Sequence, residues 1–448
     1  MKRRFLYGLL VTVLGLNLFV GAQIYFYSAQ AGDRDDPHPN IKLFVTVLDR
    51  VRQEYVDGEK VSYRDLIYGA LKGMVNNLDP HSEFMEPVKF TEMKSDTEGA
   101  FGGVGLIITS KTNMISVVEP MEDSPALRAG FLPGDRIIKI EGKSTEKMSV
   151  EDAKNKLRGP PNAPVSITIF RPSTGETKEF KIARAVIKVP SVKDINNKTE
   201  FPLSENNVGY VRITQFGEKT ADDFERALKR LESGGMQSLV LDLRGNPGGL
   251  LDSAVRICEK FLPRNQLVVS TEGRGSTPKA EYRVTSRDKH PNIPLVVLVN
   301  GGSASASEIV AGCLQDTTAL GVTKAVILGE QTFGKGSVQS VIPLPDNSAL
   351  RLTTAKYYTP SHRVIHEKGI TPDITIPMTE DEERDVFLKR IPGGLDSLDD
   401  RDRERVKNAR DPQLDRAMDL LKGISLYTKR PVPEKMAAKG SEKIQAKQ

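Results

Sequence analysis

The sequence predicts an α/β protein built from several domains. Within residues 186–377, short apolar β-type runs such as 208–213 and 295–299 alternate with helix-type segments such as 220–232 and 251–261. This alternation is typical of a sheet flanked by helices. A chain of 448 residues, 38% of them hydrophobic and 27% charged, is also long enough for two or three hydrophobic cores.

The N-terminus has the form of an export signal. Lys2-Arg3-Arg4 precedes an uncharged run at 5–32, and positive residues before an apolar segment stay on the cytoplasmic side. The run is long enough to span a bilayer, although Ala29-Gln30-Ala31 resembles a small-residue cleavage site. We expect residues 1–32 to be a signal anchor or signal peptide, and favour the anchor. The rest would lie on the periplasmic side of the inner membrane or in another extracytoplasmic space.

Residues 33–97 are predicted to form a small helical N-terminal region. After a polar, Pro-containing linker, apolar residues recur at helical spacing through 41–93, and the spacing is broken at Asp79-Pro80. The apolar positions are Leu43, Val47 and Val51 in a first helix-type stretch and Leu66, Ala70 and Met74 in a second one.

Residues 98–185 carry short strands and the signatures of a peptide-binding module. Phe101-Gly102-Gly103-Val104-Gly105-Leu106 is followed by Ser124-Pro125-Ala126, then by Pro133-Gly134-Asp135-Arg136-Ile137 and a helix-type segment at 150–157. This combination resembles a PDZ domain. The resemblance implies that an extended C-terminal peptide adds to the sheet edge while N–H groups of the 101–106 loop hold its carboxylate. Gly102 and Gly103 would permit unusual backbone angles and close approach.

The segment after the 295–299 strand is the most informative in the chain. Asn300-Gly301-Gly302 leads into Ser303-Ala304-Ser305-Ala306-Ser307-Glu308, and Gly334-Lys335-Gly336-Ser337-Val338-Gln339 follows later. A serine at the start of a helix lies where backbone N–H groups favour negative charge, so such a turn can serve as an oxyanion site. The pattern indicates a serine nucleophile with a lysine base.

Both residues also have ordinary structural explanations. Ser305 and Glu308 fit a capping box, in which the two side chains satisfy the first backbone N–H groups of a helix. Lys335, flanked by glycines, fits a solvated loop lysine or a phosphate binder. The pattern G-x-x-x-x-G-K-[ST] is absent from the chain, which weakens the phosphate interpretation.

The histidine content and the net charge argue against metal binding and nucleic-acid binding. The chain has five histidines, none in a triad motif, and it contains neither G-x-S-x-G nor H-E-x-x-H. We therefore expect no metal and no cofactor. The formal charge of +5 is modest and no basic run is interleaved with aromatics, so we expect no nucleic-acid binding. The histidines are His38, His81, His290, His362 and His366, and we interpret His81 as a structural turn residue.

These segments together resemble the carboxyl-terminal processing proteases, the Ser-Lys peptidases that include the tail-specific proteases. The resemblance covers most of the chain and implies a crotonase/ClpP-like α/β protease core at 186–377. Besides the segments already quoted, it is carried by Tyr68-Gly69-Ala70-Leu71-Lys72-Gly73-Met74, Leu78-Asp79-Pro80-His81-Ser82, Asp242-Leu243-Arg244-Gly245-Asn246-Pro247-Gly248-Gly249-Leu250, Tyr357-Tyr358-Thr359-Pro360 and Lys368-Gly369-Ile370-Thr371-Pro372-Asp373-Ile374.

The resemblance implies a role for each residue of the site. Ser305 would be the nucleophile, Lys335 its general base and Gln339 the residue that orients the lysine. The backbone N–H groups of Ala306 and Gly248 would form the oxyanion hole. Because Gln339 lies four residues after Lys335, both side chains would share one face of an extended strand.

Arg158 is a candidate relay between the PDZ domain and the protease core. It lies in Leu157-Arg158-Gly159-Pro160, a junction between PDZ elements in the family pattern. A solvated arginine at the end of a helix is an equally good explanation of the same residue.

A lysine base must be neutral, because an ammonium group has no lone pair with which to take a proton from Ser305. A lysine at its reference pKa of about 10.4 is almost wholly charged at neutral pH, whereas burial can lower the pKa by up to about 3 to 5 units. The apolar Phe333, Val338 and Ile342 are compatible with such burial. Lys335 would then activate Ser305, return the proton to the leaving amine and activate water.

The C-terminal region, 378–448, is rich in charge. It contains one helix-type segment at 413–423, and we expect its last stretch, 429–448, to be disordered. Elsewhere, Cys258 and Cys313 both occur in apolar helical contexts, which favours buried free thiols over a disulfide.

The sequence thus predicts an exported serine endopeptidase that recognises protein C-termini through its PDZ domain and cleaves through an acyl-enzyme. Its partners would be protein substrates, the membrane through its N-terminal segment, and an identical chain or an activating adaptor. Two other classes stay open. An inactive PDZ adaptor would bind tails without hydrolysis, and a crotonase-like acyl transferase would bind thioesters independently of the PDZ groove.

Overall fold

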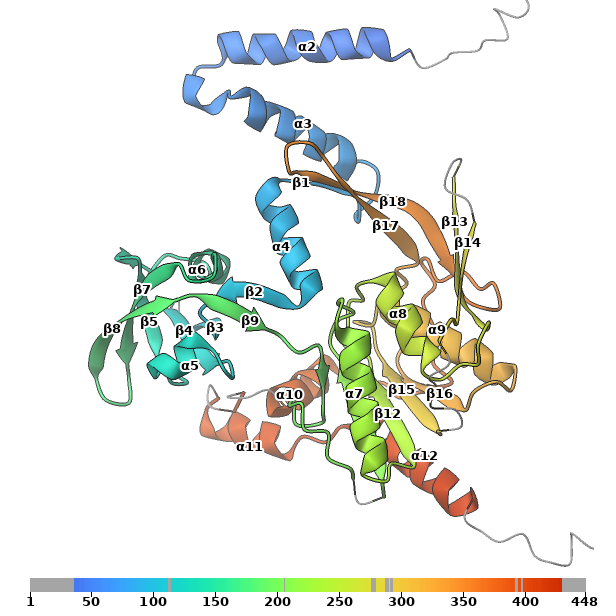
Figure 1. The fold of residues 1–448 in the computed structure, drawn as a ribbon. Coiled ribbons are helices and arrows are strands. Elements are labelled where there is room, and N and C mark those ends of the chain that lie inside the picture. Colours follow the sequence, from blue (N-terminus) through green and yellow to red (C-terminus); the bar gives the residue numbers. More distant parts are fainter. Residues whose placement is uncertain are drawn as a thin grey trace, which may run out of the picture. The chain divides into compact units, whose positions relative to one another are not determined.

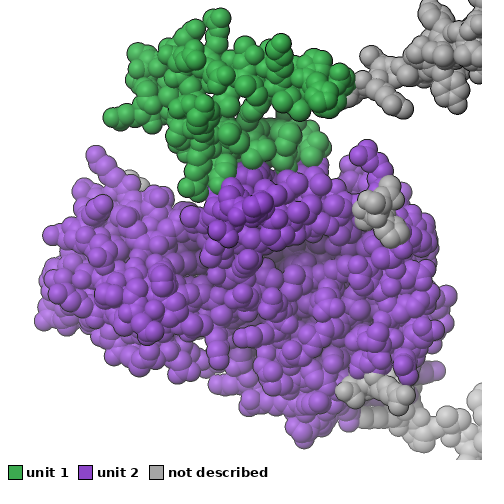
Figure 2. All heavy atoms as spheres, turned by 45° about the horizontal axis from the view of Figure 1, so that its top comes forward, with its two compact units in different colours: residues 1–78 green, residues 79–448 purple. Residues whose placement is uncertain are grey.

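The computed structural model of the protein describes residues 36–111, 114–204, 206–274, 279–286, 290, 293–390, 394–395 and 398–428. The chain divides into two compact units, residues 1–78 and residues 79–448 (Figure 2). The predicted signal segment at 1–32 and the predicted disordered tail at 429–448 lie outside the described residues. Within the described part of the chain, no helix has both the length and the apolar character needed to cross a membrane.

The first unit is helical, as predicted. Helix α2 (Pro37–Glu54), a 3-10 turn (Gly58–Lys60) and α3 (Tyr63–Asn76) follow one another along the chain (Figure 1). Each long helix begins at a side chain that accepts a backbone hydrogen bond, Asp36 for α2 and Ser62 for α3. No residue of α2 is buried, so its apolar side chains face outward.

The predicted PDZ domain folds as an antiparallel sheet with two helices. The main sheet has the order β3-β4-β5-β7-β8, with β6 paired to β5, and a separate ribbon joins β2 to β9. Apolar side chains from the sheet and from both helices form one core. The elements are β2 (Ala100–Gly103), β3 (Leu106–Lys111), β4 (Met114–Pro120), α5 (Pro125–Ala129), β5 (Arg136–Ile140), β6 (Lys143–Ser144), α6 (Val150–Leu157), β7 (Pro164–Arg171), β8 (Glu176–Ala183) and β9 (Ala185–Lys188).

The predicted protease core is built on a sheet of order β10-β11-β12-β15-β16-β19, parallel from β11 onward. Side chains alternate between its faces. Leu239 and Leu241 pack with α7, α8 and α9, whereas Val240 packs with α12. The elements are β10 (Val192–Lys193), β11 (Val208–Ile213), α7 (Thr220–Ser233), β12 (Ser238–Asp242), α8 (Leu251–Glu259), β15 (Leu295–Val299), α9 (Ala306–Ala319), β16 (Ala325–Gly329) and β19 (Ile374–Thr375).

Parallel strands place the site on one edge of this sheet. The carboxyl ends of β12 and β15 are neighbours, so the turns that follow them meet. We call residues 243–249 the β12 turn and residues 300–307 the β15 turn. Cys258 on α8 and Cys313 on α9 are buried and free, as the sequence predicted.

A second sheet, in the order β1-β18-β13-β14 with β17 on β18, carries the lysine segment. Strand β17 pairs with β18 along its whole length, with one shift of register between Val338 and Gln339. The elements are β1 (Glu83–Met85), α4 (Pro87–Glu98), which leads from this sheet to the PDZ domain, β13 (Leu267–Gly273), β14 (Ala280–Arg283), β17 (Ser337–Pro343) and β18 (Ala349–Tyr358).

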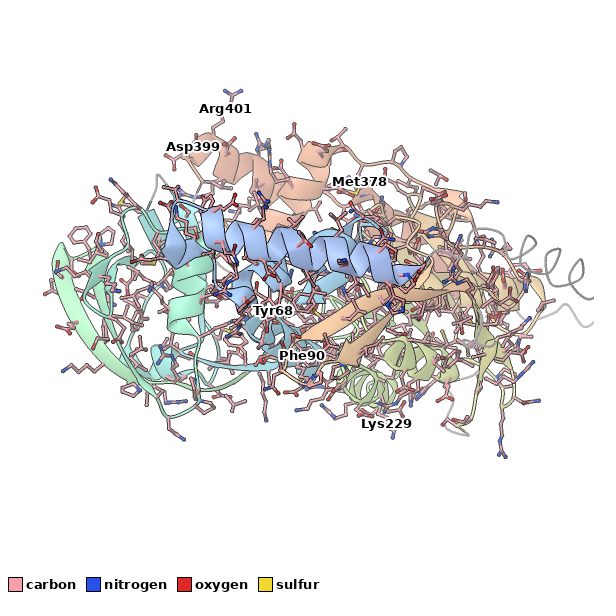
Figure 3. The ribbon with its side chains drawn as sticks, turned by 90° about the horizontal axis from the view of Figure 1, so that it is seen from above. Tyr68, Phe90, Lys229, Met378, Asp399 and Arg401 are labelled. Atoms are coloured by element: carbon pink, nitrogen blue, oxygen red, sulfur yellow. The ribbon has the colours of Figure 1, made fainter. Side chains whose placement is uncertain are left out.

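The C-terminal region contains three helices among its described residues, α10 (Glu380–Arg390), α11 (Asp400–Asn408) and α12 (Pro412–Thr428). The prediction of one helix at 413–423 was therefore incomplete. Helices α10 and α11 are so rich in charge that they show no apolar period, and Asp399 and Arg401 at the start of α11 are exposed (Figure 3).

Candidate active site

Ser305 lies in the β15 turn, immediately before α9. Its backbone angles are φ 54° and ψ −110°, which a residue with a Cβ seldom adopts. Strain of this kind costs about 1 to 3 kcal/mol and persists only where surrounding contacts enforce it. Ser305 is 7% exposed. The turn therefore holds the predicted nucleophile at the start of a helix and in a conformation that the chain must be constrained to keep.

The two neighbouring serines support the turn itself. Ser303 Oγ donates to the carbonyl of Leu243 at 2.8 Å, and Ser307 Oγ donates to the carbonyl of Asn246 at 2.9 Å. These bonds join the β15 turn to the β12 turn. The hydroxyl of Ser305 has a different neighbour.

That neighbour is the side chain of Tyr357, on β18. Burial raises the pKa of Tyr357 to about 12, with a smaller contribution from Tyr282, while its hydrogen bond to Ser305 acts in the opposite direction. The phenol is therefore protonated at neutral pH, and it can either donate a hydrogen bond to the Ser305 hydroxyl or accept one from it. The sequence showed Tyr357 only as part of a family motif, because no linear pattern reveals that β18 passes the β15 turn.

Glu308 connects the predicted nucleophile to the predicted base. Its carboxylate is fully buried and accepts hydrogen bonds from the N–H groups of Ser305 (2.7 Å), Gly334 (2.7 Å) and Lys335 (2.9 Å) and from Thr332 Oγ1 (2.6 Å). Burial raises the pKa of Glu308, and the hydrogen bonds counteract it. The predicted capping-box bond, in which the N–H of Ser305 donates to Glu308, is thus present, but the same carboxylate also accepts bonds from the lysine segment.

Lys335 lies in the turn just before β17 and is half-buried. Burial lowers the pKa of Lys335, and the positive charge of Arg351 lowers it further, whereas the negative charges of Asp79 and Glu308 raise it. The net direction is the one that a lysine base requires.

Of the three apolar residues that the sequence suggested near Lys335, Phe333 is 63% exposed and Ile342 is 42% exposed, whereas Val338 packs against the protease core. Backbone also packs against the lysine turn: a Cβ on Gly336 would lie 2.0 Å from the N atom of His366. The N–H of Glu367 also donates to the carbonyl of Gly334 at 2.8 Å.

Gln339 is not hydrogen-bonded to Lys335 in this structure, and its role in orienting the lysine stays a prediction. Among the described residues, its Nε2 donates to Ser337 Oγ at 2.9 Å and to Thr353 Oγ1 at 3.3 Å. The argument from an even spacing requires both residues to lie in one strand, but Lys335 precedes β17, which begins at Ser337.

The predicted oxyanion residues border Ser305. Ala306 is the first residue of α9, and Gly248 has φ 100°, where a Cβ would lie 2.8 Å from Ser305 Cβ and 3.0 Å from the N atom of Ala306. Only glycine fits this position. The N–H of Gly248 donates to Asn246 Oδ1 at 2.9 Å, so it is engaged within the β12 turn.

A turn at Asp79 lies beside the lysine segment. Asp79 Oδ1 accepts from the N–H groups of His81 (2.7 Å) and Ser82 (2.9 Å), and Ser82 Oγ accepts from the N–H of Thr353 at 3.0 Å. Burial, followed by the charge of Lys335, lowers the pKa of His81. The structure thus brings His81 close to the predicted base, which its place in the sequence did not indicate.

The 101–106 loop of the PDZ domain uses its glycines differently from the prediction. Neither Gly102 nor Gly103 has a positive φ, whereas Gly105 has φ 76°. Close approach is present at Gly102, where a Cβ would lie 2.1 Å from the carbonyl oxygen of Gly159. Residues Ala100–Gly103 form strand β2, so the free part of the loop is short.

Arg158 has partners at the junction of the domains. Its guanidinium lies 4.3 Å from the ring centroid of Phe101, and its Nη1 lies 3.6 Å from Asp96 Oδ1, at the end of α4. These contacts distinguish it from a freely solvated arginine.

Comparison with known proteins places this chain. Peptidase family S41 matches residues 207–376, and the PDZ domain matches residues 116–171. The carboxy-terminal-processing protease of Bartonella bacilliformis is 41% identical over 383 residues, which cover 84% of this chain and 83% of that protein. The carboxyl-terminal-processing protease of Synechocystis is 36% identical over 326 residues, which cover 72% of this chain and 74% of that protein.

Among solved structures, a photosystem II D1 C-terminal processing protease has a TM-score of 0.42 and 29% identity, covering 75% of this chain and 92% of that one. The sequence relatives extend over both the PDZ domain and the protease core. The chain therefore belongs to the carboxy-terminal processing proteases of peptidase family S41 and is a serine peptidase with a PDZ domain.

Proposed function

We propose that the protein is an exported endopeptidase that binds protein C-termini in its PDZ domain and cleaves them through an acyl-enzyme on Ser305, with Lys335 as base. The observation that carries the proposal is the buried carboxylate of Glu308, which bonds the backbone N–H groups of both residues. Such a shared anchor fixes the distance between a nucleophile and its base.

The chemistry begins with neutral Lys335, which takes the proton of Ser305 as its hydroxyl attacks the peptide carbonyl. The carbonyl oxygen becomes negative beside the N–H of Ala306, at the start of α9. Lys335 then gives the proton to the leaving amine, which departs as the N-terminus of the fragment beyond the cut. In the second half of the reaction, neutral Lys335 takes a proton from water as the water oxygen attacks the ester carbonyl. When the C–O bond to Ser305 breaks, Lys335 returns that proton to Ser305 Oγ, so that both residues regain their starting forms.

Gly248 supplies the second oxyanion donor only after a local change. Its N–H is bonded to Asn246 Oδ1 in this structure, so the peptide before Gly248 must rotate to face the substrate. The positive φ of Gly248 leaves the backbone free to do so, because glycine populates both signs of φ.

Recognition of a free carboxylate by the 101–106 loop makes the enzyme selective for tails. A substrate ending in an apolar residue with a free carboxylate should therefore be cleaved faster than its amidated counterpart. Gly103→Val should erase the difference, because the new side chain would press on the ring of Phe101, 3.0 Å from a Cβ. Cleavage of a substrate with no accessible tail serves as the control. Equal rates for free and amidated tails in the wild-type protein would contradict tail selection.

Arg158 connects the PDZ loop to the β12 turn through a continuous set of bonds. It pairs with Asp96 on α4, whose carbonyl accepts from Gln215 Nε2 at 3.3 Å. Next along the chain, the N–H of Phe216 donates to the carbonyl of Gly248 at 2.9 Å. Movement of the loop on tail binding would thus reach the predicted oxyanion residue.

The relay is tested by Arg158→Ala, with Arg128→Ala on α5 as the matched control in the same domain. Arg158→Ala should reduce the advantage of a free tail in kcat while leaving the affinity for the tail peptide unchanged. If the advantage of a free tail in kcat were as large in Arg158→Ala as in the wild-type protein, Arg158 would not be part of the relay.

Export depends on residues 1–32 in this proposal. Reversal of the charges at Lys2, Arg3 and Arg4 should retain the protein in the cytoplasm, because the positive residues set the orientation. Protease accessibility in spheroplasts measures the outcome. Unchanged accessibility would contradict the assignment of an export signal.

An identical chain or an activating adaptor would find apolar surface on α2. Ile41 is 57% exposed, Leu43 63% and Val47 52%. If this surface binds a second copy, sedimentation velocity should show a dimer that Leu43→Glu dissociates. A monomer at all concentrations would leave an adaptor as the partner.

A further inference from the structure

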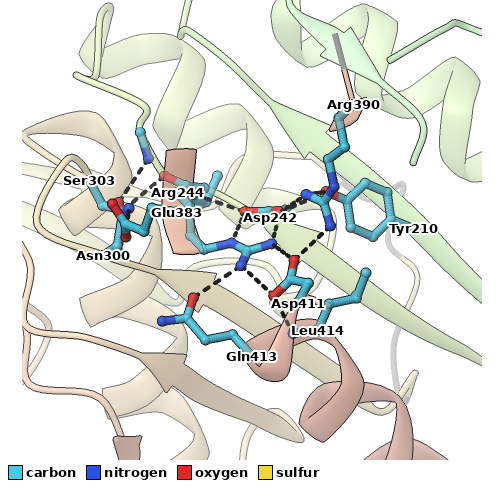
Figure 4. A network of polar contacts seen from close by, with 12 residues as sticks. Tyr210, Asp242, Arg244, Asn300, Ser303, Glu383, Arg390, Asp411, Gln413 and Leu414 are labelled. Atoms are coloured by element: carbon cyan, nitrogen blue, oxygen red, sulfur yellow. Dashed lines mark hydrogen bonds and ion pairs between the residues drawn. The ribbon is translucent and has the colours of Figure 1, made fainter. Parts of the chain in front are cut away.

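The two turns of the site are supported by side chains from the C-terminal region (Figure 4). These side chains lie beyond residue 376, where the match to peptidase family S41 ends. Two carboxylates make the connection, Asp411 just before α12 and Glu383 on α10.

Asp411 acts on the β12 turn through Arg244. Arg244 Nε and Nη2 donate to Asp242 at 3.0 and 2.6 Å, and its Nη1 and Nη2 donate to Asp411 at 2.9 and 2.8 Å. A further bond joins Nη1 to Gln413 Oε1 at 3.0 Å. Every guanidinium N–H is therefore used, and a planar group held by paired bonds on two sides has one position.

Asp411 is itself fixed by other contacts. Its Oδ1 accepts from the N–H of Leu414 at 3.0 Å, in the first turn of α12, and its Oδ2 accepts from Arg390 Nη2 at 2.7 Å. The carboxylate is 9% exposed and Arg244 is 8% exposed. Arg244 is thus held against a rigid element rather than a solvated side chain.

Glu383 acts on the β15 turn through Asn300. Its Oε1 accepts from Asn300 Nδ2 at 2.9 Å, which leaves Asn300 Oδ1 to accept from the N–H groups of Gly245 (2.8 Å) and Gly302 (3.1 Å). The amide of Asn300 therefore joins the two turns, and Glu383 determines which way that amide faces.

A shift in either carboxylate would reach the reacting groups. The carbonyl of Asn246 accepts from the N–H of Ala304 at 3.0 Å and from Ser307 Oγ at 2.9 Å, on both sides of Ser305. Asn246 Oδ1 also holds the N–H of Gly248. Residues 244–246 thus set the position of the nucleophile relative to the β12 turn.

We propose that Asp411 and Glu383 are positioning residues of the peptidase site, which hold the β12 turn against the β15 turn through Arg244 and Asn300. The inference rests on the proposed function of Ser305. It gives the C-terminal helices a part in transition-state stabilisation, in addition to the packing of α12 against the sheet.

The test compares Asp411→Asn with Asp385→Asn in the full chain. Asp385 is a matched control, since it is equally buried in the C-terminal region but pairs with Arg405 at 2.8 Å and not with Arg244. In Asp411→Asn, kcat per folded molecule should fall by about 10- to 100-fold with KM unchanged, because a displacement of about 1 Å at a catalytic group can cost 100-fold.

Two further readouts separate positioning from loss of structure. Affinity for a peptide boronic acid, whose adduct with Ser305 occupies the oxyanion site, should fall in proportion to kcat in Asp411→Asn. Affinity of the PDZ domain for a tail peptide should not change. The proposed function is tested separately from this inference, by cleavage in the wild-type protein and loss of cleavage in Ser305→Ala.

Glu383→Ala provides a second variant at a half-buried position, where the fold is less at risk. It should also lower kcat with KM unchanged. Wild-type kcat per folded molecule in Asp411→Asn, or an equal loss in Asp385→Asn, would overturn the proposal. If Asp411→Asn does not fold, wild-type kcat in Glu383→Ala would overturn it instead.

Discussion

At the scale of residues, the strained backbone of Ser305 is held by the carboxylate of Glu308. The N–H of Ser305 is bonded to Glu308 Oε2, and the same carboxylate bonds the backbone of Lys335. A buried carboxylate with several donors is costly to replace, because each donor loses its partner. One residue thus maintains both the strain and the spacing of the predicted pair.

Glu308→Gln should therefore lower both stability and activity. A glutamine offers one acceptor oxygen where the carboxylate has two, and its amide N–H groups would face other donors. We expect a loss of about 1 to 3 kcal/mol in the free energy of unfolding, measured by urea denaturation, together with a large fall in kcat. Glu330→Gln, in a nearby segment, is the control. Wild-type stability and activity in Glu308→Gln would show that the shared anchor is unimportant.

The charges around Lys335 predict the pH dependence of activity. Only the neutral amine is a base, so kcat/KM should rise with pH through the lowered folded-state pKa of Lys335. Asp79 raises that pKa, so Asp79→Asn should move the acidic limb to lower pH. Arg351 lowers it, so Arg351→Gln should move the limb to higher pH.

Asparagine suits this test because its oxygen can still accept the two backbone bonds of the Asp79 turn. The groups that face Lys335 also include Glu308 and His81. If the acidic limb disappeared in His81→Asn, the base would be a histidine. Shifts of the same sign in Asp79→Asn and Arg351→Gln would also contradict the electrostatic account.

Sequence reasoning predicted Ser305 as nucleophile and Lys335 as base from local motifs, but it did not show how the two residues are connected. Glu308 was interpreted only as a capping partner, since its bonds to Gly334 and Lys335 span more than 20 residues. The prediction that Gln339 orients Lys335 assumed that both residues lie in one strand, whereas β17 begins only at Ser337, and a strand boundary of this kind is hard to locate from sequence.

At the scale of elements, the site depends on how closely the β12 turn approaches the β15 turn. Gly248 lies where any Cβ would strike the carbonyl of Ala304, at 2.7 Å, and Ser305. In contrast, a Cβ on Gly301 would meet no atom within 4 Å. The two glycines therefore have different physical reasons to be present.

Gly248→Ala should abolish peptidase activity, because the residue has φ 100° and no room for a side chain. Gly301→Ala should retain most activity, since its position is open. Hydrolysis of a free-tail peptide, corrected for folded protein by circular dichroism, measures both. Activity in Gly248→Ala would show that the turns need not approach so closely.

Elements with an apolar period were predicted well. The strand predicted at 208–213 is β11 and that at 295–299 is β15, with the same bounds. Helices α10 and α11 were missed because ion pairs stabilise them, such as Arg405 with Asp385 at 2.8 Å. Such pairs leave no apolar stripe for sequence analysis to detect.

At the scale of the whole molecule, the order of regions was predictable and their connections were not. The PDZ and protease motifs are local in sequence, so each could be recognised by itself. The contacts of Asp96 with Arg158 and Gln215, and of Arg244 with Asp411, join segments far apart in the chain. These contacts carry the proposed relay and the proposed support of the site.

The central claim is that Ser305 and Lys335 act as one catalytic unit. The most direct test is the rate of hydrolysis of a free-tail peptide by purified wild type, Ser305→Ala, Lys335→Ala and the double variant. The account predicts that each single variant falls nearly as far as the double variant, because members of a catalytic unit are not additive. Substantial activity in Lys335→Ala, or loss in Ser303→Ala or Ser307→Ala with activity kept in Ser305→Ala, would contradict it.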